Sequence, residues 1–145
     1  VVARVKPSAI KDISSWRFWN GVEWDAEIEN VKPVTDRVSN EISITPMKDG
    51  RYLLVFQADG IGTHTAVRIG KSPVGPFGPL QKIWLVPELQ EPPGIIPYNA
   101  KAHPVLSHNN KLLISYNTIS LDYFNDILKY PHMYRPRFFW LELPE

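Results

Sequence analysis

The chain contains no cysteine among its 145 residues. This excludes a disulfide framework, a zinc site built on cysteine and a thiol nucleophile. The chain also lacks an excess of one charge: 16 Lys and Arg stand against 15 Asp and Glu, which leaves a net charge of +1. So balanced a charge disfavours a nucleic-acid partner. No apolar run approaches the roughly 20 residues of a membrane-spanning helix, so we expect no membrane partner either.

Aromatic residues and proline are abundant instead. The chain has five Trp, six Tyr, six Phe and 14 Pro, and so many prolines leave little room for long helices. Aromatics with Val and Ile between turn signals predict an all-β chain, with hairpin turns at Asn20-Gly21 and Asp49-Gly50. A proline-rich connection over 91–97 and a long polar-aromatic loop over 120–134, with room for one helical turn, interrupt the strands. We expect strands at 2–5, 16–20, 22–25, 41–47, 51–56, 63–69, 80–86, 102–106, 111–117 and 135–143.

An internal repeat organises these strands. The segment DGRYLLVF at 49–56 matches NNKLLISY at 109–116 at an offset of about 60 residues, and the preceding strands, 41–47 and 101–107, coincide too. A unit of four short strands that repeats in this way is typical of a β-propeller blade. A β-sandwich with chance similarity is the alternative.

On this interpretation the chain is one partial propeller domain over 1–145. Residues 1–35 supply the outer strands of one blade, 38–88 form a complete blade, and 97–143 form a last blade without its closing strand. About two and a half blades cannot close a ring and leave sheet edges open. We therefore expect a missing N-terminal half, or another chain, to complete the ring. The first residue is Val rather than Met, which predicts a removed leader or a start inside a longer protein.

Three motifs carry a resemblance to a known family. YNAKAHP at 98–104 and YRPRF at 134–138 resemble the C-terminal blade of a family of bacterial glycosyl-hydrolase-like proteins with a five-bladed β-propeller fold. SPVGPF at 72–77 resembles a turn shared more widely by propeller arabinanases, xylosidases and mannoside phosphorylases. The likeness covers about residues 14–143.

The resemblance implies a funnel on the propeller axis, lined by the first strand of each blade. By blade and strand, Glu41 matches the general acid of the related hydrolases, and His103 matches an axial histidine that helps to hold a metal ion or water. No cofactor is certain; a Ca ion or a water in the central channel is the candidate. Glycoside cleavage needs a proton donor and a second carboxylate, and the resemblance puts the second, an Asp, in the missing first blade. We therefore expect this chain alone to be inactive.

Each candidate also has a plainer interpretation. Glu41 would be a solvated surface residue in a sandwich, and a lone histidine such as His103 is more often a hydrogen-bonded core residue than a ligand. Lys101, the expected counterpart of Glu41 one blade on, could bind substrate or pair with Glu41 across the channel. Tyr98 and Asn99 are expected as polar substrate contacts.

Two arginines and three tryptophans leave similar alternatives open. Arg135 and Arg137 could clamp the carboxylate of an acidic sugar or tie the last blade to its neighbour. Trp16, Trp19 and Trp24 could stack on sugar rings or simply pack between sheets.

The sequence thus predicts a secreted glycoside hydrolase that acts on a poly- or oligosaccharide. Its extracellular or periplasmic location is implied by the resemblance alone. Two alternatives remain: a carbohydrate-binding propeller that has lost its catalytic carboxylates, and a propeller for protein–protein interaction. The second would show a large apolar patch in place of a polar funnel.

Overall fold

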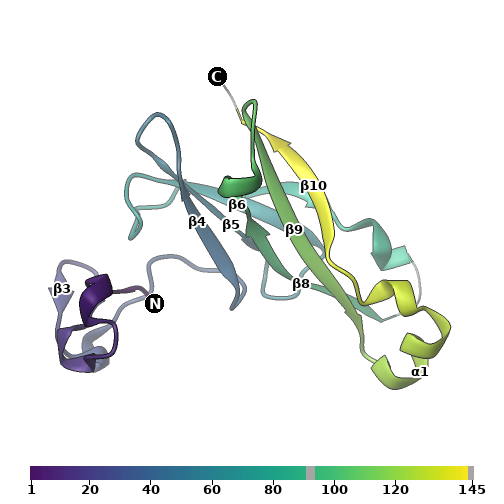
Figure 1. Ribbon diagram of the computed structural model, residues 1–145, viewed down its shortest axis with the longest axis horizontal. Helices are drawn as coiled ribbons and strands as arrows, with labels where there is room; N and C mark the ends of the chain where they lie inside the picture. Colours follow the sequence, from purple (N-terminus) through teal and green to yellow (C-terminus); the bar gives the residue numbers. More distant parts are fainter. Residues whose placement is uncertain (91–93, 144–145) are drawn as a thin grey trace.

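The computed structural model describes residues 1–90 and 94–143, which form three antiparallel sheets (Figure 1). The strand orders are β1-β2-β3, β4-β5-β6-β7 and β10-β9-β8, so every sheet is open and has two edge strands. The all-β prediction is therefore confirmed. The strands are β1 (Ala3–Arg4), β2 (Arg17–Trp19), β3 (Trp24–Asp25), β4 (Ile42–Pro46), β5 (Tyr52–Gln57), β6 (His64–Gly70), β7 (Gln81–Leu85), β8 (Ile95–Ala102), β9 (Lys111–Ser120) and β10 (Arg137–Glu142).

Helices are short throughout the described residues. None of them has the length and hydropathy that crossing a bilayer requires. Four of the 3₁₀ helices begin with proline, whose missing N–H costs nothing at a first helical position. The α-helix α1 spans Tyr123–Lys129 within the expected loop, and it is longer than the single turn anticipated there. The 3₁₀ helices are Pro7–Ala9, Ile13–Ser15, Ile28–Asn30, Pro87–Gln90, Pro104–Leu106 and Pro131–Met133.

The N-terminal sheet lies apart from the other two (Figure 1). Its hairpin turns where expected: the Asn20 side chain accepts two backbone N–H groups of the turn, and Gly21 has a φ of 98°. The rings of Trp19 and Trp24 meet edge to face with centroids 5.4 Å apart, and the Arg4 guanidinium lies 4.4 Å from the Trp24 centroid. These tryptophans pack within their own small sheet.

The four-stranded sheet is built around β5, which is covered on both faces. Leu53 and Val55 face a core shared with the third sheet, whereas Leu54 and Phe56 belong to a second core on the other face. A strand that is buried on both faces has a continuous apolar sequence, as β5 does. Gly50, with a φ of 84°, supplies the left-handed residue that the preceding hairpin turn needs.

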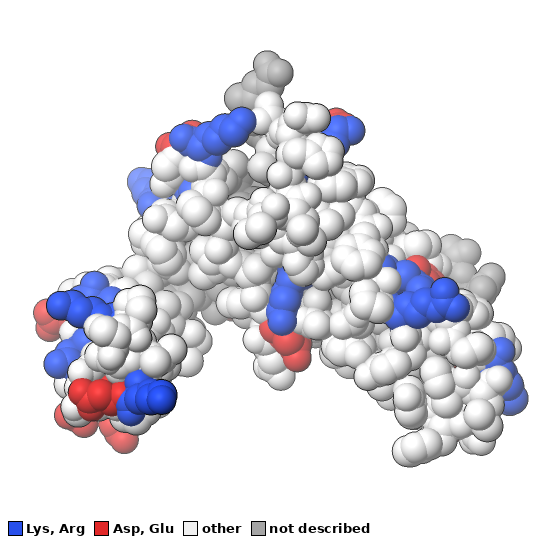
Figure 2. Space-filling view, in the orientation of Figure 1, with Lys and Arg blue, Asp and Glu red and all other residues white. Residues whose placement is uncertain are grey.

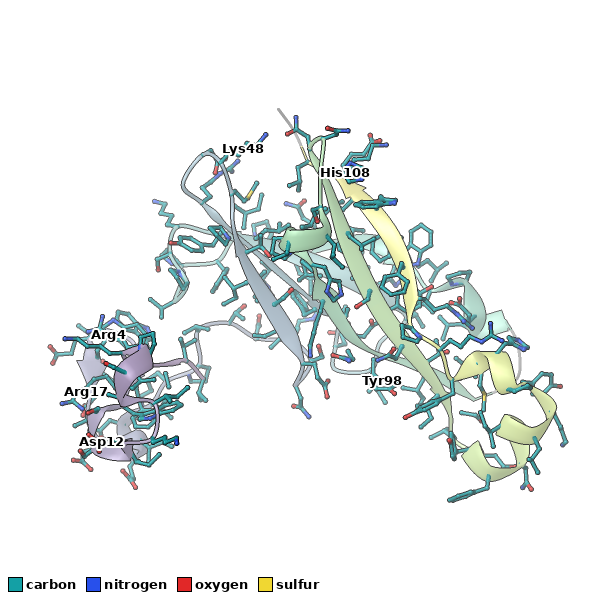
Figure 3. The ribbon with its side chains drawn as sticks, in the orientation of Figure 1. Arg4, Asp12, Arg17, Lys48, Tyr98 and His108 are labelled. Carbon is teal, nitrogen blue, oxygen red and sulfur yellow. The ribbon has the colours of Figure 1, made fainter. Side chains whose placement is uncertain are left out.

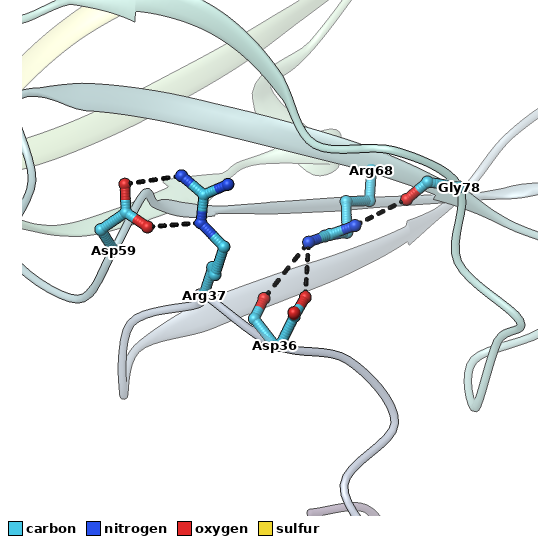
Figure 4. Close-up of polar contacts among 5 residues, drawn as sticks. All are labelled: Asp36, Arg37, Asp59, Arg68 and Gly78. Atoms are coloured by element: carbon cyan, nitrogen blue, oxygen red, sulfur yellow. Dashed lines mark hydrogen bonds and ion pairs between the residues drawn. The ribbon is translucent and has the colours of Figure 1, made fainter.

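The segment that precedes β4 is fastened to this sheet by two ion pairs (Figure 4). The Arg37 guanidinium binds both carboxylate oxygens of Asp59, at 2.6 and 3.0 Å. Arg68 donates to Asp36 Oδ1 at 2.7 Å and to the Gly78 carbonyl at 2.8 Å. These contacts fix where the chain enters β4, and therefore where Glu41 lies.

The third sheet corrects one strand prediction. The expected strand at 102–106 is wrong: β8 ends at Ala102, and Pro104–Leu106 is a 3₁₀ helix. Pro104 cannot donate to a ladder, so the strand cannot continue through it. Part of the expected proline-rich connection is instead the start of β8 at Ile95, and its residues 91–93 lie outside the described residues. Pro97 is tolerated within β8 because β8 is an edge strand.

Candidate functional site

The edge strands β4 and β8 belong to different sheets but lie next to one another. The backbone N–H of Ala102 in β8 donates to Ser43 Oγ in β4 at 2.7 Å. Below this contact, Ala100 and Ala102 pack into the shared core with Val55. This contact sets the start of β4 beside the end of β8, so side chains of the two strands border a common region.

Strand register identifies which residues occupy equivalent positions there. Ile42 pairs with Phe56, and Tyr98 pairs with Asn117. Phe56 aligns with Tyr116 in the repeat, one residue before Asn117. Glu41, one residue before Ile42, therefore corresponds to Tyr98. The expected correspondence with Lys101 is wrong, because β8 starts earlier than the repeat predicts and contains a bulge.

Glu41 and three tyrosines gather at this end of the sheets. Burial raises the pKa of Tyr98, and the neighbouring Tyr134, the negative charge of Glu41 and the nearby Tyr123 raise it further. The Glu41 side chain is exposed and forms no ion pair or hydrogen bond with another described residue. The Glu41 carboxylate and the Tyr98 phenol, with two further phenols near Tyr98, supply a carboxyl group and polar aromatic surface to one end of the sheets.

A β-bulge shapes the site between Tyr98 and Lys101. Asn99, inside the bulge, has a φ of 59°, a left-handed conformation that is rare for residues with a side chain. Its Oδ1 is buried and has no hydrogen-bond partner among the described residues. Bulges and left-handed residues are frequent beside functional sites, where they redirect side chains.

His103 lies just after β8, where its own N–H donates to the Leu113 carbonyl at 2.8 Å. Its Nε2 lies 2.7 Å from Ser115 Oγ, so this ring atom already has a partner. The described residues contain no group of three His, Cys, Asp or Glu side chains placed to hold a metal. They do not by themselves form a metal site, and a metal role for His103 stays a prediction that requires ligands from elsewhere.

The two arginines at and just before the start of β10 differ in their contacts. Arg137 Nε donates to Glu88 Oε1 at 2.7 Å, and the same carboxylate accepts the Tyr116 hydroxyl at 2.9 Å on Oε2. Glu88 follows β7, so this cluster joins the second sheet to the third. Arg135 is exposed. Sequence reasoning missed Glu88 because it lies 49 residues from Arg137 in the chain.

The opposite end of the sheets carries a groove of about 590 Å³ between the β4–β5 and β8–β9 turns. Figure 3 labels Lys48 and His108 at this end, far from Tyr98. Lys48 donates to Asn110 Oδ1 at 2.6 Å, and Arg51 pairs with Asp49 at 2.6 Å. These cations are already engaged. On the face in Figure 2, charged side chains of both signs cluster at the lower left, at the top and at the right, and one basic and one acidic side chain lie near the centre.

Comparisons with known proteins agree with the fold. Residues 1–142 match the model of a family described as "Domain of unknown function (DUF5005)". None of the curated proteins matches the chain. A crystal structure described as that of a putative hydrolase from Bacteroides ovatus is similar, with a TM-score of 0.71 and 22% sequence identity over 94% of this chain. The likeness covers 37% of that longer chain, and at this identity it supports the fold alone.

Proposed function

We propose that this chain, which belongs to the DUF5005 family, is part of a hydrolase that cleaves glycosidic bonds in a poly- or oligosaccharide. One end of its sheets carries an unpaired carboxylate and nearby phenols. The observation that carries the proposal is the position of Glu41. It stands at the beginning of the first strand of its sheet, beside Tyr98 at the equivalent position of the next sheet. The similar solved structure is described as a putative hydrolase, and hydrolysis is the reaction class proposed here.

In this proposal Glu41 is the general acid that donates a proton to the leaving oxygen. Such an acid needs a covered site that keeps its carboxyl protonated at working pH, whereas Glu41 is exposed to solvent here. The covering surface and the second carboxylate would come from outside this chain. Tyr98, Asn99, Lys101 and Arg135 would bind sugar hydroxyls or a sugar carboxylate.

The proposed architecture is a five-bladed propeller in which each larger sheet is a blade. The β4–β7 sheet has the four strands of a complete blade, and the β8–β10 sheet has three. An N-terminal half or another chain would supply the missing strand and blades. The similar solved structure has a longer chain, of which the match covers only 37%, and this supports the proposal that further blades are needed. We further propose that the protein acts outside the cytoplasm, where polysaccharides occur.

A carbohydrate-binding protein without catalysis is the second candidate. One point favours it: saccharide binding needs no second carboxylate, whereas hydrolysis requires two, and in the proposal above the second one comes from outside this chain. In that case the same end of the sheets binds a saccharide and releases it unchanged.

The test is to replace Glu41 with glutamine in the intact protein. We expect Glu41→Gln to lower the release of reducing sugar from a panel of plant and bacterial polysaccharides by at least about 100-fold, the usual contribution of a general acid, while oligosaccharide affinity stays within about two-fold. Glu23→Gln is the matched control, because Glu23 is exposed in the N-terminal hairpin. Equal activity of Glu41→Gln and wild type would exclude the catalytic role. Binding without any cleavage by the wild type would favour the second candidate.

A further inference from the structure

The connection between β9 and β10 presents aromatic rings near Tyr98. Tyr134, at its C-terminal end, is 54% exposed and lies near the phenol of Tyr98. Tyr123, at the start of α1, contacts Tyr134 edge to face with centroids 5.6 Å apart. Tyr123 also meets Phe124 in the same geometry, at 5.4 Å. An exposed ring is thus supported from the side by a half-buried one.

The backbone of this connection is anchored at both ends. Thr118 in β9 donates its hydroxyl to the Met133 carbonyl at 2.6 Å, and the Met133 side chain is buried, with 3% of its surface exposed. Ser120 Oγ donates to Asp126 within α1 and accepts the N–H of Asp122 at 3.0 Å. The backbone at Tyr134, the residue after Met133, is therefore held in place before any ligand arrives. A ring on a fixed backbone loses less conformational entropy on binding than one on a mobile segment.

We infer that Tyr134, supported by Tyr123, is a stacking platform for a sugar ring that binds beside Tyr98, at the end of the sheets that also carries Glu41. The inference rests on the proposed function and names a binding residue for it. Sugar rings carry an apolar C–H face and a rim of hydroxyls. An exposed phenol suits the apolar face, because an aromatic ring gives large apolar contact with few rotatable bonds. The neighbouring Tyr98 hydroxyl and the carboxylate of Glu41 suit the hydroxyl rim.

Competing uses of these rings fit the structure less well. A core role would bury Tyr134, yet half of its surface is exposed. A purely structural contact between connection and sheet is already made by Met133 and Thr118. Tyr98, which has Tyr134 and Tyr123 as neighbours, also lies at the end of the sheets opposite the groove (Figure 3).

The experiment measures affinity by isothermal titration calorimetry in the intact protein. The probes are linear pentasaccharides of arabinose, xylose and mannose, each added to the wild type and to Tyr134→Ala, Tyr134→Phe and Tyr123→Ala. We expect Tyr134→Ala to weaken binding on the order of ten-fold, as loss of one aromatic contact predicts. Tyr134→Phe keeps the ring and should bind within about two-fold of the wild type. Trp140→Ala is the matched control, because Trp140 is 44% exposed and lies beside His108 at the other end.

The outcomes separate the platform from the proposed function. A wild type that cleaves a saccharide, together with a Tyr134→Ala variant of unchanged affinity, would overturn the platform alone. Equal losses in Tyr134→Phe and Tyr134→Ala would also overturn it, because the hydroxyl and not the ring would then carry the contact. Binding that depends on Tyr134 without cleavage would support the platform and reject hydrolysis. If the wild type neither binds nor cleaves any probe, both proposals fail. Thermal unfolding followed by circular dichroism verifies that each variant is folded.

Discussion

Replacing Tyr116 with phenylalanine tests the contact that joins the second sheet to the third. The Tyr116 side chain is only 2% exposed, and its hydroxyl donates to Glu88 Oε2 at 2.9 Å. Burial raises the pKa of Tyr116 from 10.0 to about 12; Trp84 opposes the increase, and the Glu88 carboxylate adds to it. The phenol is therefore held protonated in the folded protein at pH values where an unfolded tyrosine ionises.

The sign and size of the pH effect follow from this difference. Because the pKa is higher in the folded state, the stabilisation is complete below pH 10 and is lost between pH 10 and 12. A pKa difference of this size corresponds to at most about 2.7 kcal/mol in the free energy of unfolding, of which about 1.4 kcal/mol is lost by pH 11. At pH 8, Tyr116→Phe removes a hydrogen bond to a charged group and should cost about 1.5–3 kcal/mol. Glu88 keeps its ion pair with Arg137 at 2.7 Å.

Urea unfolding of the wild type and Tyr116→Phe at pH 8, 10 and 11 measures both effects. We expect the wild type to have the larger free energy of unfolding at pH 8. The difference from Tyr116→Phe should then be smaller by about 1.4 kcal/mol at pH 11. Absorbance at 295 nm should show one phenol fewer ionising late in the variant. A gap that stays constant from pH 8 to 11, or a Tyr116 phenol that ionises with the exposed tyrosines, would refute the assigned burial and its partner.

Two further pairs of substitutions test the cores and the bulge. Phe56→Ala should lower the free energy of unfolding by about 3–5 kcal/mol through the cavity it leaves, since Phe56 is fully buried. The control Phe124→Ala removes a ring that is 82% exposed and should change this free energy by no more than about 0.5 kcal/mol. Equal effects of the two substitutions in chemical denaturation would contradict the described cores. Asn99→Gly should leave the free energy of unfolding nearly unchanged, whereas Asn99→Val should lower it by about 1–2 kcal/mol, because a β-branched residue resists the left-handed conformation at a φ of 59°. Equal thermal stability of the two variants would show that the bulge is not formed.

Local signals in the sequence were sufficient for most of the fold. Asn20-Gly21 and Asp49-Gly50 predicted hairpin turns, and both glycines adopt the positive φ that such turns require. The buried strand over 51–56 was evident from its continuous apolar run. These features depend on residues close together in the chain, where turn chemistry and side-chain periodicity act directly.

Contacts between distant segments set the limit of sequence prediction. The repeat placed Lys101 opposite Glu41, but an early start of β8 and its bulge put Tyr98 there. A bulge adds residues to one strand without a distinctive composition, so a fixed offset cannot detect it. The cluster of Glu88, Tyr116 and Arg137 was missed for a similar reason: only packing of one sheet on the next brings its members together.

The neighbouring edges of β4 and β8 explain why polar residues collect at this end. Two edge strands that lie side by side could in general pair and merge their sheets. Pro46 in β4 and Pro97 in β8 lack the N–H groups that such a ladder needs. The N–H of Ala102 is taken by the Ser43 hydroxyl instead of a backbone carbonyl. The sheets therefore meet through side chains rather than through a backbone ladder, and Glu41 just before β4 and Tyr98 within β8 lie where the two sheets meet.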